Sequence, residues 1–210
     1  MSCMPCPRNS TGKRNTMNPN HPKKGSQTRV DPIKNLKDIK SIKKLLLDKP
    51  RDHALFVMGI NTNLRASDLI NITVGQVRDL KSGEDLVLKE IKTGKSRRIT
   101  LNSACVTAIK DLLESSNLTD SDPLFKSKKG DKLIVPSVSR LVKNWCRQIN
   151  LKGNFAAHTL RKTWGYHQRV TFNTDIPTLM ECFNHSTQKQ TLTYLCVQPE
   201  EIRGVYENEL

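Results

Sequence analysis

The sequence lacks any long hydrophobic run, and no apolar stretch approaches the roughly 20 residues that a membrane-spanning helix needs. It also lacks the n-region, apolar stretch and cleavage site of a secretory signal peptide, so export is not expected. Residues 1–30 contain no acidic residue and very few apolar ones. Because such a segment cannot bury enough surface to offset the entropy of ordering, it is predicted to be a disordered basic leader.

The six cysteines show no disulfide or zinc pattern. The C-x-x-C formed by Cys3 and Cys6 has no second pair in a segment without a core, and a loose tail is the better interpretation. The remaining cysteines lie in apolar patterns and are expected to be small buried side chains: Cys105, Cys146, Cys182 and Cys196. This usage fits a reducing, cytoplasmic setting.

Positive charge is the excess in this sequence. Its 210 residues include 35 Lys and Arg against 20 Asp and Glu, a formal net charge of +15. An excess of this size favours a polyanionic partner, of which nucleic acid is the commonest, with an anionic membrane surface as the alternative. A hydrophobic content of 36% suffices for one core.

Hydrophobic periodicity predicts one α+β domain, mainly helical, over residues 31–210. Three short alternating runs, at 74–77, 86–91 and 98–101, predict a small three-stranded antiparallel sheet. Helix starts are expected after Asn63 and at the capping residues Ser103 and Ser137. Helical spacing is found at 36–46, 51–60, 64 onward, 103–113, 138–149, 157–169, 174 or 175 onward, 188–195 and 199–207.

Residues able to grip and attack a phosphate gather between positions 158 and 194. His158 and Arg161 are three apart on a predicted helix and share a face, although H-x-x-R is common by chance. Arg65 is expected at a helix start, where backbone N–H groups attract anions, and could equally form a surface pair with Asp68. The basic hairpin tip at 92–98 suits either a groove contact or a charged sheet edge.

The spacing of His185 and Tyr194 matters because one continuous helix would put them on opposite faces. Thr187 and Gln190 form a capping-box pattern, so a helix is predicted to begin after Thr187. His185 would then stand in the preceding turn and could fold back toward Tyr194. The prediction is a break in the helix at 184–187.

Five motifs in this order resemble the catalytic domain of the tyrosine recombinases, the phage integrase family. The resemblance covers most of the region after residue 31, and it implies that family's DNA breaking-rejoining fold. The motifs are NLRASDL at 63–69, KTGK at 92–95, HTLRKT at 158–163, FNHS at 183–186 and TLTYL at 191–195.

The resemblance also implies a reaction. Tyr194 would attack the scissile phosphate to give a 3′-phosphotyrosyl link and a free 5′-hydroxyl, with no metal, ATP or other cofactor. Arg65 and Arg161 would bind the phosphate, and Lys92 (or its neighbour Lys95) would protonate the leaving 5′-oxygen. His158 would deprotonate the tyrosine, and His185 would form a hydrogen bond to the phosphate.

Two departures from the family pattern stand out. Asn184 occupies a position where the family often has glycine. Family members also usually carry a helical DNA-clamping domain before the catalytic one, and only the basic leader precedes residue 31 here. The implied partners are duplex DNA and further copies of the chain, from dimer to tetramer, with no membrane and no small-molecule substrate.

Three functions fit this pattern: a site-specific recombinase or integrase, a type IB topoisomerase-like enzyme, and a catalytically silent DNA-binding domain. The short chain and the small hairpin motif favour the recombinase. A pure DNA-binding domain would have no need of Tyr194. The last predicted helix, 199–207, could pack against its own chain or against a neighbouring copy.

Overall fold

The structure is a computed structural model that describes residues 30–195, 206, 207 and 209. Residues 1–29 of the predicted leader and nearly all of the predicted helix 199–207 therefore lie outside the described residues, as do Cys3, Cys6 and Cys196. Within the described part, no helix has both the length and the apolar character needed to cross a membrane.

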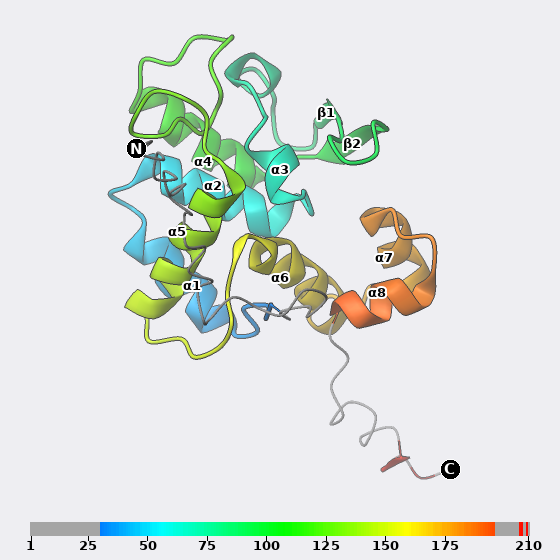
Figure 1. Ribbon diagram of the computed structural model, residues 1–210. Helices are drawn as coiled ribbons and strands as arrows, with labels where there is room; N and C mark the ends of the chain where they lie inside the picture. The colour runs from blue at the N-terminus through cyan, green and yellow to red at the C-terminus, as the bar shows by residue number, and fades with distance from the viewer. Residues whose placement is uncertain (1–29, 196–205, 208, 210) are drawn as a thin grey trace, which may run out of the picture.

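Helices form most of the fold (Figure 1). Helix α2, buried along most of its length, packs against α4 and α6, and α5 packs against α6. The helices are α1 (Leu36–Leu45), α2 (Pro50–Asn61), α3 (Ala66–Leu69), α4 (Ser103–Glu114), α5 (Val135–Gln148), α6 (Ala157–Val170), α7 (Ile176–Phe183) and α8 (Gln188–Leu195). The α+β, mainly helical class predicted from the sequence is confirmed.

The sheet has two strands in the described chain, and the predicted third strand is wrong. Strands β1 (Asp85–Lys89) and β2 (Ser96–Thr100) pair antiparallel. Residues 74–77 instead contain the 3-10 helix η1 (Val74–Gln76). The reason is local: the Gln76 side chain accepts a hydrogen bond from the backbone N–H of Thr73 at 2.9 Å, which closes a capping box.

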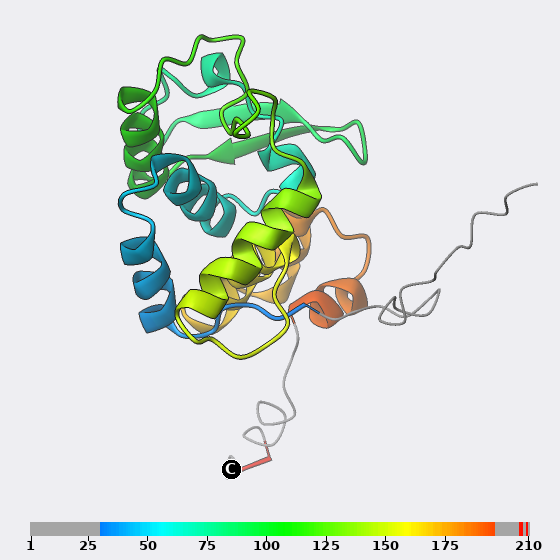
Figure 2. The same ribbon diagram turned by 60° about the vertical axis from the view of Figure 1, so that its left-hand side comes forward.

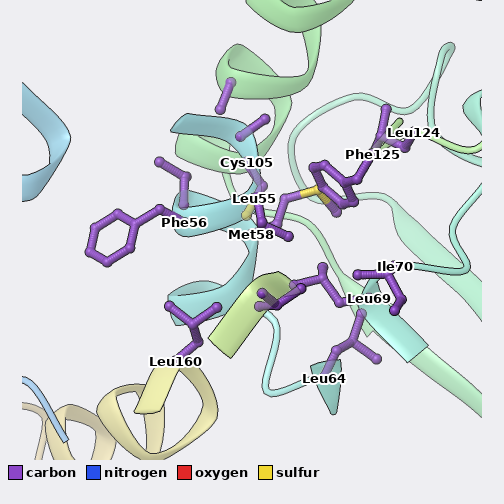
Figure 3. Close-up of a cluster of buried hydrophobic side chains, with 14 of the residues drawn as sticks. Leu55, Phe56, Met58, Leu64, Leu69, Ile70, Cys105, Leu124, Phe125 and Leu160 are labelled. Carbon is purple, nitrogen blue, oxygen red and sulfur yellow. The ribbon is translucent and has the colours of Figure 1, made fainter. Parts of the chain in front are cut away.

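Two hydrophobic clusters lie at different places in the fold. The main core surrounds α2, where Leu55 and Met58 pack among side chains from α3, α4 and α6 (Figure 3). Trp145 is buried in this core, edge-on to Phe56 at 5.8 Å between ring centroids, as its place on the apolar stripe of α5 indicated. The smaller cluster holds Leu179, Phe183 and Leu195, with Trp164, Ile176 and Tyr194 packed against it.

Several helix starts differ from the predictions. Asn63 adopts a positive φ of 52° instead of capping a helix, and α3 begins one residue after Arg65. Helix α4 is capped by Asn102, one residue before the predicted Ser103. Helix α5 begins at Val135 because Pro136 is tolerated in its first turn. The predicted start of α7 is confirmed, with Asp175 as its capping residue.

Of the cysteines in the described part of the chain, Cys105 and Cys146 are buried as expected, and Cys182 is exposed. The prediction for Cys182 is wrong because it lies on the outer face of α7, near the end of that helix. Figures 1 and 2 both place α7, α8 and the β1–β2 hairpin on the same side of the molecule. A hydrogen bond from Arg97 on β2 to the carbonyl of Cys182 joins these two parts.

Candidate active site

All six residues singled out from the sequence line one cavity of about 550 Å³. They come from the start of α3, the β1–β2 turn, the first turns of α6, the α7–α8 turn and α8. Thr93, Lys95, Asn184, Ser186 and Gln190 complete the described lining, which contains no carboxylate. The six are Arg65, Lys92, His158, Arg161, His185 and Tyr194.

Arg161 is the most deeply buried cation of the cavity, with 3% of its surface exposed. Its Nη2 donates to the carbonyl of Phe183 at 2.9 Å, whereas its buried Nε and Nη1 have no hydrogen-bond partner among the described residues. Burial lowers the pKa of Arg161 to about 10, aided by the positive charges of Arg65 and Arg97 and opposed by Tyr194. The guanidinium stays charged at neutral pH and has donors available for an anion.

Arg65 is held by a carboxylate behind the cavity. Its Nη1 lies 2.8 Å from Oε2 of Glu90 and 3.9 Å from Oδ2 of Asp68. Glu90 is 1% exposed. Burial would raise the pKa of Glu90, but hydrogen bonds from Thr93, Arg97 and Arg65 outweigh it and lower that pKa to about 2. Glu90 is therefore ionised and anchors the Arg65 guanidinium.

Glu90 also shapes the turn that carries Lys92. Its side chain accepts from the Thr93 hydroxyl at 2.8 Å, and its backbone carbonyl accepts from the N–H of Gly94 at 2.8 Å. The turn requires a left-handed residue, and Gly94 supplies it with φ 68°. Lys92 and Lys95 both reach the cavity from this turn.

Glu90 and Arg97 were not recognised as parts of the site from the sequence. The available signal was Glu90 as the single carboxylate within a run, 89–98, that contains five Lys and Arg residues. An acid surrounded by that much positive charge is a candidate for several ion pairs at once.

His158 lines the cavity from the first turn of α6. Partial burial lowers its pKa below 6.5, and the charges of Arg161, Lys162, Arg65 and Lys92 lower it further. The imidazole is therefore neutral at pH 7, the form that can accept a proton.

The predicted break before α8 is confirmed. Helix α7 ends at Phe183, Asn184 is left-handed with φ 55° and ψ 47°, and α8 begins at Gln188. The hydroxyl of Thr187 accepts from the N–H of Gln190 at 3.3 Å, as the capping pattern indicated. The chain thus reverses between His185 and Tyr194.

His185 is held at one face of its ring and at one ring nitrogen. It stacks on Phe183 at 5.1 Å between centroids, and its Nδ1 lies 3.0 Å from the Thr191 hydroxyl. Burial lowers its pKa to about 4, with contributions from the charges of Arg161 and Arg65. His185 is therefore neutral at pH 7.

Tyr194 lies next to His185 and two cations. Its ring centroid is 5.6 Å from that of His185, 6.0 Å from Cζ of Arg161 and 5.3 Å from Nζ of Lys162. Tyr166, on α6, contacts the His167 ring instead and is absent from the described lining of the cavity. The break before α8 therefore brings one tyrosine, Tyr194, to the cations of the cavity.

Residues 29–201 match the model of the phage integrase family. The probable integrase/recombinase YoeC of Bacillus subtilis (strain 168) is 33% identical over 182 residues, covering 85% of this chain and 96% of the relative. Tyrosine recombinase XerC of Caldanaerobacter subterraneus subsp. tengcongensis is 34% identical over 167 residues, covering 77% of this chain and 46% of the relative. The chain thus spans about half the length of the XerC relatives it matches.

Solved structures share the fold. The XerA recombinase superposes with a TM-score of 0.70 and 21% identity over 92% of this chain and 68% of that protein. A lambda integrase dimer bound to a COC′ core site superposes with a TM-score of 0.60 and 16% identity, covering 81% of this chain and 60% of that protein. At these identities the superpositions speak for the fold alone.

Proposed function

Since the chain belongs to the phage integrase family of tyrosine recombinases, we propose that it cleaves and rejoins duplex DNA at specific sites through a 3′-phosphotyrosyl intermediate on Tyr194. The observation that carries this proposal is the cavity itself. It gathers Arg65, Arg161, Lys92 and Lys95 around one phenol without a carboxylate in its described lining. A phosphodiester is the anion that such a site suits.

The phosphate would be bound by the two arginines. The Nε and Nη1 donors of Arg161 are buried and without a partner among the described residues, so they are available to two oxygens of one phosphate. The pentacoordinate transition state carries more negative charge than the ground state. Donors fixed by Phe183 and Glu90 therefore stabilise the transition state without reorganising.

The covalent step exchanges one phosphate ester for another. The Tyr194 oxygen forms a bond to phosphorus while the bond from phosphorus to the 5′-oxygen breaks. The phenolic proton passes to neutral His158, and Lys92 gives a proton to the departing 5′-oxygen. Attack by a 5′-hydroxyl on the phosphotyrosine reverses the step, so the bond energy is conserved and no nucleotide cofactor is consumed.

His185 would donate to a phosphate oxygen. Its pKa of about 4 keeps the ring neutral, so only one of its nitrogens carries a proton at pH 7. When Nδ1 accepts from the Thr191 hydroxyl, Nε2–H is left for the phosphate.

We further propose that the chain acts as a homo-oligomer on DNA, in the cytoplasm, as a catalytic domain that starts near residue 31. Recombination joins strands from two sites, so at least two copies must meet. The lambda integrase structure is a dimer bound to a core site. The net charge of +15 supplies a sequence-independent attraction to both DNA partners.

A nicked suicide duplex containing candidate target sites tests the chemistry. Loss of the short fragment after cleavage traps the intermediate, which migrates as a protein–DNA adduct on a denaturing gel. The adduct is expected with the wild-type chain and is expected to vanish with Tyr194→Phe. Tyr166→Phe is the matched control, because it removes a hydroxyl from a tyrosine outside the cavity.

The outcomes separate the three functions. DNA binding without an adduct from any duplex would instead support a silent DNA-binding domain. An adduct accompanied by relaxation of supercoiled plasmid lacking paired sites would support a topoisomerase. Strand exchange that needs two sites supports the recombinase.

A further inference from the structure

We propose that Glu90 is a positioning residue that aligns Arg65, the Lys92 turn and the His185 turn with one another. The proposal rests on the function proposed above and assigns a role to a carboxylate that lies outside the cavity lining. Glu90 follows directly after β1 and is buried to 1% exposure.

The two oxygens of Glu90 contact three segments. Oε2 lies 2.8 Å from Nη1 of Arg65 and accepts from the Thr93 hydroxyl at 2.8 Å. Oε1 accepts from Nη1 of Arg97 at 2.9 Å. One carboxylate thus fixes the start of α3, the residue after Lys92 and the side chain of Arg97.

Arg97 carries the connection to α7. Its Nη2 donates to the carbonyl of Cys182 at 2.8 Å, and Nδ2 of Asn63 donates to the same carbonyl at 2.7 Å. Carbonyls in the last turn of a helix have no intrahelical partner, and the helix dipole places negative charge there. A guanidinium held by Glu90 therefore fixes the backbone three residues before His185.

The electrostatics explain why this position holds an acid. Arg65, Arg97 and Arg161 are close enough for the first two to lower the pKa of the third. Without an anion between Arg65 and Arg97, their mutual repulsion and desolvation would drive them apart. Glu90 offsets that repulsion from behind, while the cavity keeps its excess positive charge for the phosphate.

Glu90→Gln is the first test, because it keeps the shape and removes the charge. We expect single-turnover cleavage of a saturating suicide duplex to fall by roughly 100-fold, the loss that misalignment of reacting groups produces. We expect the Kd for DNA to change by less than about 3-fold, because the affinity comes from many phosphate contacts and the substitution disturbs the alignment of one of them. A similar rate loss is expected for Glu90→Asp, which keeps the charge but is too short to reach all three partners.

Asp85→Asn is the matched control. It removes a carboxylate from the adjoining strand β1, where Asp85 lies 3.5 Å from Arg98 and accepts from the Thr100 hydroxyl at 2.7 Å, outside the cavity. Its cleavage rate should match the wild type. Circular dichroism and thermal melting of each variant identify any variant that is unfolded.

Amide hydrogen exchange of the free protein tests whether the two turns stay in place, and it needs neither DNA nor a cleavage assay. In Glu90→Gln, exchange should accelerate both at 92–95 and at 184–186, and remain unchanged in α2 and α4. Arg97→Lys keeps the charge but loses the fork, and should accelerate exchange at 184–186 alone.

These readouts keep the two proposals separable. A wild-type chain that forms no adduct defeats the proposed function, while the exchange data still decide on the alignment. Wild-type cleavage by Glu90→Gln, or faster exchange at only one of the two turns, would overturn the role assigned to Glu90.

Discussion

Lys92 and Lys95 lie three residues apart on one turn, and both line the cavity. They differ in their surroundings. The charge of Lys92 is among those that lower the pKa of His158, so Lys92 lies within electrostatic range of that imidazole. Lys95 also lines a neighbouring cavity, beside Arg97 and Trp164. This difference favours Lys92 as the acid that protonates the leaving 5′-oxygen.

Replacing each lysine by methionine tests this assignment. Lys92→Met should lower the cleavage rate by about 100-fold or more, the contribution that a general acid makes, and Lys95→Met by less than about 10-fold. A duplex with sulfur at the bridging 5′ position should restore Lys92→Met to near the wild-type rate, because a thiolate leaves without being protonated.

Arg161→Lys supplies the control for that rescue. It removes phosphate-binding donors, so the sulfur substrate should leave it slow. If the sulfur substrate restored the cleavage rate of Lys95→Met and not that of Lys92→Met, Lys95 would be the acid.

At the scale of single residues, the sequence predicted the groups that face the cavity and missed those behind it. His158 and Arg161 could be found because they share one helix turn. The basic run around Glu90 marked it as an ion-pair candidate but did not identify its partners, because Arg65 is 25 residues away and the link to α7 passes through Arg97, 85 residues before Cys182. Local pattern carries no information on such distant contacts.

The segment that carries the nucleophile, α7 and α8, has a small hydrophobic cluster of its own. Both helices pack on α6, and close packing there depends on Gly165. A Cβ at this position would lie 2.5 Å from Cζ of Phe183 and 2.8 Å from Cδ2 of Leu195. Contacts this short would displace α7 and α8 from α6.

Gly165→Ala should therefore lower the cleavage rate by about 10-fold or more, although alanine favours a helix by about 1 kcal/mol over glycine. Global unfolding by urea should change little, because the main core is untouched. The measurements are the single-turnover cleavage rate and the urea midpoint.

Gly59→Ala provides the contrast for that experiment. Its Cβ would lie 2.6 Å from Cδ1 of Leu160 in the main core, and overpacking there costs about 1–3 kcal/mol of unfolding free energy. Equal loss of stability in both variants would show that the two clusters unfold as one.

At the scale of elements, helices were easier to predict than the sheet. A periodic apolar face extends over many residues and predicts a helix as a whole, and the capping pattern of Thr187 and Gln190 predicted the start of α8 at Gln188. The run 74–77 was too short for its alternation to compete with the capping box between Thr73 and Gln76. Helix starts shifted where a proline or an asparagine, such as Pro136 or Asn102, offered a better terminus than the predicted serine.

At the scale of the whole molecule, burial and the excess of positive charge together determine how its histidines titrate. His53, His158 and His185 all have lowered pKa values, burial being the first cause in each. Below pH 6.5 the unfolded chain binds protons that the folded chain does not, so stability must fall as the pH drops. Glu90 adds a second loss, between its ordinary pKa of 4.5 and its folded pKa of about 2.

Urea unfolding across pH 4–8 tests this titration. The free energy of unfolding should be level above pH 7 and decline from about pH 6.5 downward. His185→Asn should reduce the slope between pH 6.5 and 4, because it removes one proton taken up on unfolding. A slope unchanged by this substitution would contradict the lowered pKa of His185.

The left-handed backbone at Asn184 changes how its motif is best written. The turn of this chain needs a positive φ at this position, and asparagine is among the few residues other than glycine that adopt one readily. What the turn requires at position 184 is a positive φ angle, and more than one residue type can supply it. A search that insists on glycine before the second histidine would pass over sequences that fold this turn equally well, and one that accepts asparagine there would retain them.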